Sequence, residues 1–139
     1  MVQTTADKIA RLTDPKSVVT IGKIPVVVFR QLKNRGMTAV TRNVVLTGER
    51  RAHYLGRHKD IVPHEAELVR LLVDPYAVHL NKKDAQMTVW YRQIDDSHFL
   101  RAAVWVSDKN ALQNSVHSIR LANVEEIEQG EKQGRLIWK

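Results

Sequence analysis

The chain has 139 residues, of which 43% are hydrophobic and 27% charged, proportions typical of one folded domain rather than a disordered segment. Lysine and arginine number 22 against 15 aspartate and glutamate, so the formal net charge of +7 favours anionic partners such as nucleic acid. There is no cysteine, which excludes disulfides, thiolate metal sites and cysteine nucleophiles.

The first half of the chain alternates helical and extended patterns. We expect, in chain order, a helical arm in residues 1–15, a strand at 17–22, a helix at 24–36, a strand at 42–47, and helices at 48–58 and 63–74. Residues 24–36 suit helix or strand by propensity, but Pro25 near the start and Gly36 at the end favour a helix. Thr47 is expected to cap the next helix, and Pro63 to open the last one.

The second half of the chain changes to a period of two. We expect strands at 76–81, 86–94, 98–107 and 115–123, then an amphipathic helix at 124–134 and a tail at 135–139 that adds an edge strand. This order predicts one α+β domain, in which the N-terminal helices pack on one face of an antiparallel four- to five-stranded meander sheet. The arm precedes the main body of this domain, residues 16–139.

The helix at 48–58 is unusually basic. At about 100° per residue, Arg50, His53 and Arg57 fall within roughly 60° of one another and form one stripe. His58 sits about 140° from His53, near the helix end, where the dipole favours a cationic imidazole. Two interpretations stay open at this point: a solvated face with His58 as a cap, or a surface for phosphate binding and proton transfer.

The histidines do not form a metal-binding pattern. His53 and His58 lack the i, i+4 spacing of a zinc helix, and no acidic residue lies between them. The remaining strand histidines, His79, His98 and His117, are scattered over three strands, where a lone histidine is more often structural. We therefore expect no metal site and no cofactor.

Alternation along the strands gathers polar side chains on one sheet face. These are Tyr91, Arg101, Ser118 and Arg120. The same alternation puts Val116 on the face of Ser118, and puts His117 with Ile119 on the opposite one. Such a face is either the exposed side of a one-sided sheet or part of a binding surface, and alternation does not decide between them.

The order of these features resembles a known nuclease family. The strings VVLTGERRAHYLGRHKDI, LLVDPYAVHL, TVWYRQI, LRAAVWVS and SVHSIRLA resemble the phage-associated branch of the BECR superfamily, which groups barnase, EndoU, the colicin RNases and RelE. In that family a helix carries His, three or four residues, then Arg-His, a second helix ends at Asp-Pro or Asn-Pro, and a meander ends in a strand with a central Thr or Ser. The resemblance covers about residues 17–138 and implies a barnase/RelE-like fold.

The resemblance also implies an activity: metal-independent RNA cleavage, in which the 2′-hydroxyl attacks the adjacent phosphate. It assigns proton transfer to His53 and His58, in either order, and positioning to Tyr91 and Ser118. The side chains that would bind RNA are Arg50, Arg57, Lys59, Arg92, Arg101 and Arg120, with Arg57 and Arg120 at the scissile phosphate. The family more usually has Thr at the strand position of Ser118 and an aromatic where Arg120 stands, which leaves the role of Ser118 open.

The implied partners are RNA, either tRNA or another cellular RNA, and an immunity or antitoxin protein. No membrane partner is expected, because the start of the chain lacks a secretory pattern and no apolar run reaches the length of a span. We expect a cytoplasmic protein acting in a host or target cell, or one associated with a virion. Two alternatives remain: a non-catalytic nucleic-acid-binding or virion-associated domain of the same fold, and an interaction module that dimerises through the Trp138 tail.

Overall fold

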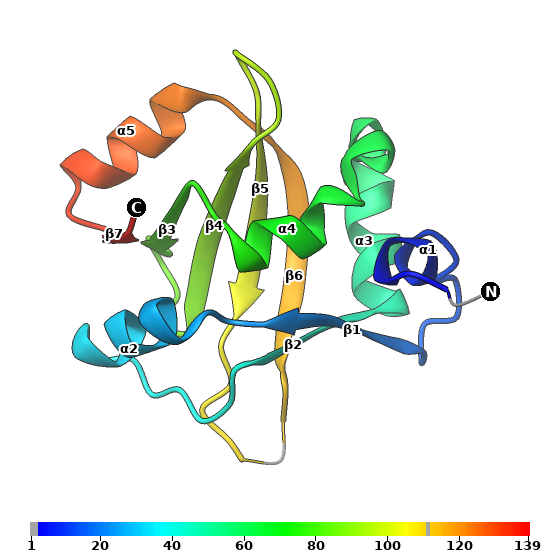
Figure 1. The fold of residues 1–139 in the computed structure, drawn as a ribbon, viewed down its shortest axis with the longest axis horizontal. Coiled ribbons are helices and arrows are strands. Elements are labelled where there is room, and N and C mark those ends of the chain that lie inside the picture. The colour runs from blue at the N-terminus through cyan, green and yellow to red at the C-terminus, as the bar shows by residue number, and fades with distance from the viewer. Residues whose placement is uncertain (1–2, 111) are drawn as a thin grey trace.

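The computed structural model describes residues 3–110 and 112–139, which form one seven-stranded sheet in the order β1-β2-β6-β5-β4-β3-β7 (Figure 1). Its strands are β1 (Val18–Lys23), β2 (Asn43–Thr47), β3 (Ala77–Leu80), β4 (Met87–Gln93), β5 (Phe99–Trp105), β6 (Asn114–Ala122) and β7 (Leu136–Trp138). The helices are α1 (Thr5–Ala10), α2 (Val26–Asn34), α3 (Gly48–Arg57), α4 (Glu67–Val73) and α5 (Val124–Lys132), with a 3₁₀ helix η1 (Lys59–His64). Across these ranges, no helix combines the length and the apolar character that a membrane crossing requires.

The sheet is larger than predicted, and it is mixed. The meander of β3 to β6 is confirmed as antiparallel, but the expected total of four to five antiparallel strands is wrong. β2 pairs with β6 in parallel and brings β1 with it, while β7 pairs with β3 at the other end. The physical reason is that alternation within a strand shows which residues share a face, but not which strand lies alongside.

Helices cover both faces of the sheet rather than one. Trp90 and Leu100 point into the main core with residues of α1 to α4. Val89 and Tyr91, their neighbours on the opposite face, pack against Ile127 of α5. Figure 1 shows α5 apart from the other helices, across the sheet from α4. The expectation of helices on a single face is therefore wrong for α5.

The start of α3 is fixed by the loop between α1 and β1. Thr47 caps the helix as predicted, its hydroxyl oxygen accepting a hydrogen bond from the amide of Arg50 at 3.2 Å. The amide of Gly48 donates to the carbonyl of Ser17 at 3.0 Å, and a Cβ on Gly48 would lie 1.9 Å from the carbonyl oxygen of Asp14. Strand β2 pairs with β6, and α3 begins where β2 ends. The helix therefore continues beside β6 (Figure 1).

A buried ion pair determines where the next helix starts. Pro63 was expected to open α4 but lies inside η1, and α4 begins at Glu67. Between them, Glu65 accepts two hydrogen bonds of 2.8 Å from Arg51 and one from the Tyr54 hydroxyl. All three side chains are buried. This pairing holds the chain after α3 as a tight turn, which a pattern of apolar residues does not predict.

The N-terminal arm is part of the core. Ile9 of α1 is fully buried and Leu12, just after it, is nearly so. Arg51 of α3 donates a hydrogen bond of 3.1 Å to the carbonyl of Leu12. The segment that follows the first helix therefore contacts α3 directly and helps to position it.

Candidate functional site

The basic stripe of α3 faces away from the core. His53 and Arg57 are exposed and Arg50 is half-buried, whereas Arg51 and Tyr54 are buried on the opposite side of the helix. The predicted grouping of Arg50, His53 and Arg57 on one side is thus consistent with the burial of this helix. What the stripe contacts decides whether it is more than a solvated face.

A bulge in β6 brings a histidine to this stripe. Ala103 of β5 lies opposite Ser118, and the next residue of β5 lies opposite Val116, so His117 is an extra residue in β6. The bulge reverses the expected alternation, because Val116 and Ile119 both point into the core. The predicted placement of Val116 on the face of Ser118 is therefore wrong. The sequence contains a signal for this bulge. Val116 and Ile119 are three residues apart, so in a regular strand they could not both face the core.

Arg50 and His117 are in direct contact. The Arg50 Nε donates to the carbonyl oxygen of His117 at 3.0 Å, and its Nη2 lies 2.9 Å from the His117 Nε2. Partial burial lowers the pKa of His117, and the charges of Arg50 and His53 lower it further. We call Arg50, His53, Arg57 and His117 the α3–β6 cluster. It presents two imidazoles and two guanidinium groups on one side of the molecule.

Three other predicted residues lie near this cluster in the chain. His58 ends α3 and is half-buried, with its amide donating to the carbonyl of Tyr54 at 2.8 Å. Lys59 is exposed at the start of η1, which lies against β6. Ser118 is half-buried next to His117. The structure therefore places α3 and η1 beside β6, and the side-chain contact observed there joins Arg50 to His117.

A second group of predicted residues surrounds Glu126 of α5. Its Oε1 accepts a hydrogen bond from Arg120 at 2.7 Å, and its Oε2 accepts one from the Tyr91 hydroxyl at 2.6 Å. Arg101 Nε lies 3.2 Å from the same Oε2. The strand register aligns Tyr91 with Arg101 and Arg101 with Arg120, which agrees with the predicted shared face. We call these four residues the Glu126 cluster.

Within the Glu126 cluster the Tyr91 hydroxyl and Arg120 are hydrogen-bonded to the carboxylate, whereas the Nε of Arg101 is buried without a hydrogen-bond partner among the described residues. Tyr91 is 3% exposed, and burial together with its bond to Glu126 raises the pKa of its hydroxyl. Burial acts to raise the pKa of the Glu126 carboxyl, but hydrogen bonds from Tyr91 and Arg120 outweigh it, so the pKa is lowered. Tyr91 therefore lies beneath α5 with its hydroxyl engaged by Glu126, rather than beside the imidazoles of α3.

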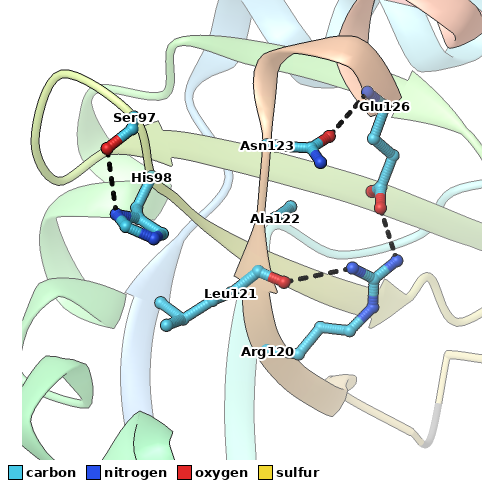
Figure 2. Close-up of a pocket in the computed structure, with 7 residues that line it drawn as sticks. All are labelled: Ser97, His98, Arg120, Leu121, Ala122, Asn123 and Glu126. Carbon is cyan, nitrogen blue, oxygen red and sulfur yellow. Dashed lines mark hydrogen bonds and ion pairs between the residues drawn. The ribbon is translucent and has the colours of Figure 1, made fainter.

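An open pocket adjoins the Glu126 cluster at the junction of β6 and α5. It has a volume of about 300 Å³. Figure 2 shows its lining residues: Ser97, His98, Arg120, Leu121, Ala122, Asn123 and Glu126. Arg120 follows His117 by three residues, or about 10 Å at roughly 3.3 Å per residue along a strand. The pocket and the α3–β6 cluster are thus connected by β6.

Arg92 belongs to neither cluster. Its Nε donates to Glu67 at 2.9 Å and its Nη1 to the carbonyl of Asp74 at 3.1 Å, so it joins β4 to both ends of α4. Its role in the structure is to hold that helix, and its partners Glu67 and Asp74 belong to neither cluster.

Sequence reasoning also missed the two acids that organise these arginines. Glu126 follows Asn123 by three residues, and this spacing does predict a helix start: the Asn123 side chain accepts from the amide of Glu126 at 3.2 Å. The pairing of its carboxylate with strand arginines, and that of Glu65 with Arg51, depends on tertiary contacts that no local spacing reveals.

The α3–β6 cluster can bind an anion and exchange protons, because guanidinium groups match phosphate oxygens and imidazoles titrate near neutrality. Among the described residues, no group of three or more histidine, aspartate or glutamate side chains is placed to hold a metal ion. Comparison with known proteins gives no relative for this chain: no family model, no curated protein and no solved structure matches it.

Proposed function

We propose that the protein is an endoribonuclease that cleaves RNA without a metal ion, using the α3–β6 cluster together with His58 at the end of α3. The observation that carries the proposal is the contact between the basic stripe of α3 and the bulge of β6. It puts Arg50 against His117 and close to His53, on an accessible side of a chain with net charge +7. The resemblance of the sequence to the BECR nucleases, which also implies their barnase-like fold, suggests the same chemistry.

The reaction needs one proton acceptor, one proton donor and groups that stabilise negative charge. The 2′-oxygen of RNA forms a bond to phosphorus while its proton passes to a base. The bond from phosphorus to the 5′-oxygen breaks, and an acid gives that oxygen a proton, which leaves a 2′,3′-cyclic phosphate. In the proposal His53 performs one transfer and His58 the other, and each such group typically contributes about a hundredfold or more.

The arginines stabilise the phosphate as charge builds up on it. Arg57 is exposed on the same side of α3 as His53, and Arg50 lies one turn before His53. The resemblance assigns Arg120 to the phosphate, but the Nη2 of Arg120 donates a hydrogen bond to Glu126. We therefore assign the scissile phosphate to Arg50 and Arg57, and keep Arg120 and Ser118 for the flanking part of the RNA strand.

A nucleic-acid-binding protein without activity is the second candidate. It is favoured by the Glu126 cluster, in which Tyr91 and two arginines are engaged by a carboxylate of the same chain. Such a protein would use the same charges to hold RNA and would not need the imidazoles. The two candidates therefore differ in their dependence on His53.

The test is an RNase assay with purified protein and a labelled single-stranded RNA in the presence of EDTA. We expect cleavage with cyclic phosphate ends, and a loss of at least about a hundredfold in His53→Ala. His64→Ala is the matched control, since His64 ends η1 and lies outside both clusters and the pocket that Arg120 lines. It should retain full activity.

The outcomes separate the two candidates. Salt-dependent RNA binding without cleavage would reject the nuclease and support the binding protein. Cleavage that survives in His53→Ala would reject this site, even if the protein is an RNase.

A further inference from the structure

The protonation state of His117 is specified by its contact with Arg50. An arginine guanidinium has five N–H donors and no acceptor. The His117 Nε2, 2.9 Å from the Arg50 Nη2, must therefore be the unprotonated nitrogen of a neutral ring. The ring proton then resides on Nδ1, which makes the tautomer of His117 an observable prediction of the geometry.

The same contact fixes the arginine. Its backbone amide is bound to the cap residue Thr47, and its guanidinium is held by both the carbonyl and the imidazole of His117. Two of the five N–H donors are used in this way, which leaves three for another acceptor. Because an ordered guanidinium loses little entropy when it binds, it is a better anion receptor than a free one.

We propose that His117 is a positioning residue, whose neutral imidazole and carbonyl hold Arg50 as a preorganised receptor for one phosphate of a bound RNA strand. The proposal rests on the proposed function for the identity of the ligand. The chemistry of the site asks for a tetrahedral anion with several oxygen acceptors, which a phosphodiester supplies. His53, one turn along α3, adds a further donor when it is protonated.

The bulge gives a structural reason for this arrangement. A regular strand would bury either His117 or Ser118, because alternate residues face the core. The extra residue lets Val116 and Ile119 both reach the core while His117 remains exposed beside α3. Bulges next to functional sites commonly redirect a side chain in this manner. Neighbouring protein atoms partly desolvate the ring of His117, and this and the charge of Arg50 lower its pKa, which keeps the ring neutral as its acceptor role requires.

The test uses a 2′-deoxydinucleotide, which presents one phosphodiester and lacks the attacking hydroxyl. Its affinity is measured by NMR titration of the wild type, His117→Leu and His117→Gln, each with and without Arg50→Ala. We expect His117→Leu to weaken binding by about threefold to tenfold. His117→Gln, whose amide oxygen can accept from Arg50, should recover most of the affinity. In Arg50→Ala the leucine substitution should have no further effect.

Nitrogen NMR of the histidine rings in the wild type provides a second measurement that depends on no variant. His117 should carry its proton on Nδ1 at about pH 7.5, whereas most neutral histidines carry it on Nε2. A ring protonated on Nε2, equal affinity in His117→Leu and the wild type, or no dinucleotide binding at all would overturn the proposal.

These results stay separate from the test of activity. Dinucleotide binding that depends on His117 in a protein that cleaves no RNA would leave the receptor in place and remove the nuclease. Full RNA cleavage by a protein whose dinucleotide binding does not depend on His117 would keep the nuclease and remove the receptor.

Discussion

Glu65 and Glu126 each accept hydrogen bonds from a tyrosine hydroxyl and from at least one arginine, but the two carboxylates lie in different surroundings. The side chain of Glu65 is 6% exposed, and Arg51 reaches it with two parallel hydrogen bonds of 2.8 Å. The side chain of Glu126 is 29% exposed and lies on the rim of an open pocket. The first set of residues is sealed between α3, the end of η1 and the segment after α1, whereas the second is partly open to solvent between α5 and the sheet.

The difference shows that the same residue types can serve two purposes. In the Glu65 set, every charge is matched inside the protein, so the ion pair positions α3 and its exposed stripe without contributing a free charge. In the Glu126 cluster, two arginines share one carboxylate, so one positive charge is left over at the rim of the pocket. Burial therefore separates a structural pair from a pair that can still attract an anion.

The largest loss of stability is expected from changing the buried ion pair of Glu65 and Arg51. Glu65→Gln keeps the size of the side chain but leaves Arg51 charged and unmatched in the interior. Removing one partner of a buried ion pair typically costs about 3–5 kcal/mol. We expect a loss of this size in the free energy of unfolding, measured by urea denaturation. The Arg51→Met, Glu65→Leu double variant is the control: with both charges gone, it should recover part of the loss. A loss below about 1 kcal/mol in Glu65→Gln would contradict the structural role.

The sequence predicts the elements of this fold better than their partners. The cap at Thr47 and the glycine stop at Gly36, which adopts a φ of +87°, are local signals and are confirmed. The parallel pairing of β2 with β6 joins segments that are far apart in the chain, and nothing in either strand specifies it.

The candidate site shows the same limit. The stripe on α3 follows from helical geometry alone, so Arg50, His53 and Arg57 could be grouped in advance. The contact with His117 depends on a bulge, which shifts the faces of β6 by one residue. Since register controls which side chains face a partner, one inserted residue was enough to conceal the closest contact of the stripe.

A buried histidine makes the Glu126 side of the molecule sensitive to acid. His79 of β3 is fully buried, its ring stacks edge-on against Tyr91 at 5.2 Å between centroids, and a Cβ on Gly130 of α5 would lie 2.3 Å from its Nδ1. Within the described residues, neither ring nitrogen has a hydrogen-bond partner. Burial lowers the pKa of His79 below its ordinary value of 6.5, and the charge of Arg135 lowers it further, against an opposing effect of Glu131.

The second prediction follows from that lowered pKa. Above about pH 6.5 the ring is neutral in both the folded and unfolded chain, so its protonation contributes nothing to the pH dependence of stability. Below it, the unfolded chain binds the proton more readily, so stability falls as the pH is lowered, by at most about 1.4 kcal/mol per pH unit. We expect the protection of the amides of α5, the helix packed on His79, to fall between about pH 6.5 and 5, once exchange rates are corrected for the intrinsic pH dependence of amide exchange. His79→Leu, of similar volume, should remove most of this change. An unchanged pH dependence in that variant would reject His79 as its source.

The smallest loss of stability is expected from changing Glu126, which is partly exposed to solvent. Glu126→Gln still accepts hydrogen bonds from Tyr91 and Arg120, and solvent at the pocket rim screens the charge of Arg120 that it no longer neutralises. We expect a loss of roughly 1 kcal/mol in the free energy of unfolding, well below that of Glu65→Gln. Removing this carboxylate also raises the positive charge beside β6, so RNA should bind more tightly, and the slope of affinity against salt should become steeper. Urea denaturation and binding titrations at two salt concentrations measure the two effects. If Glu126→Gln proved as destabilising as Glu65→Gln with no gain in RNA affinity, both carboxylates would be structural, and the distinction drawn from their exposure would fail.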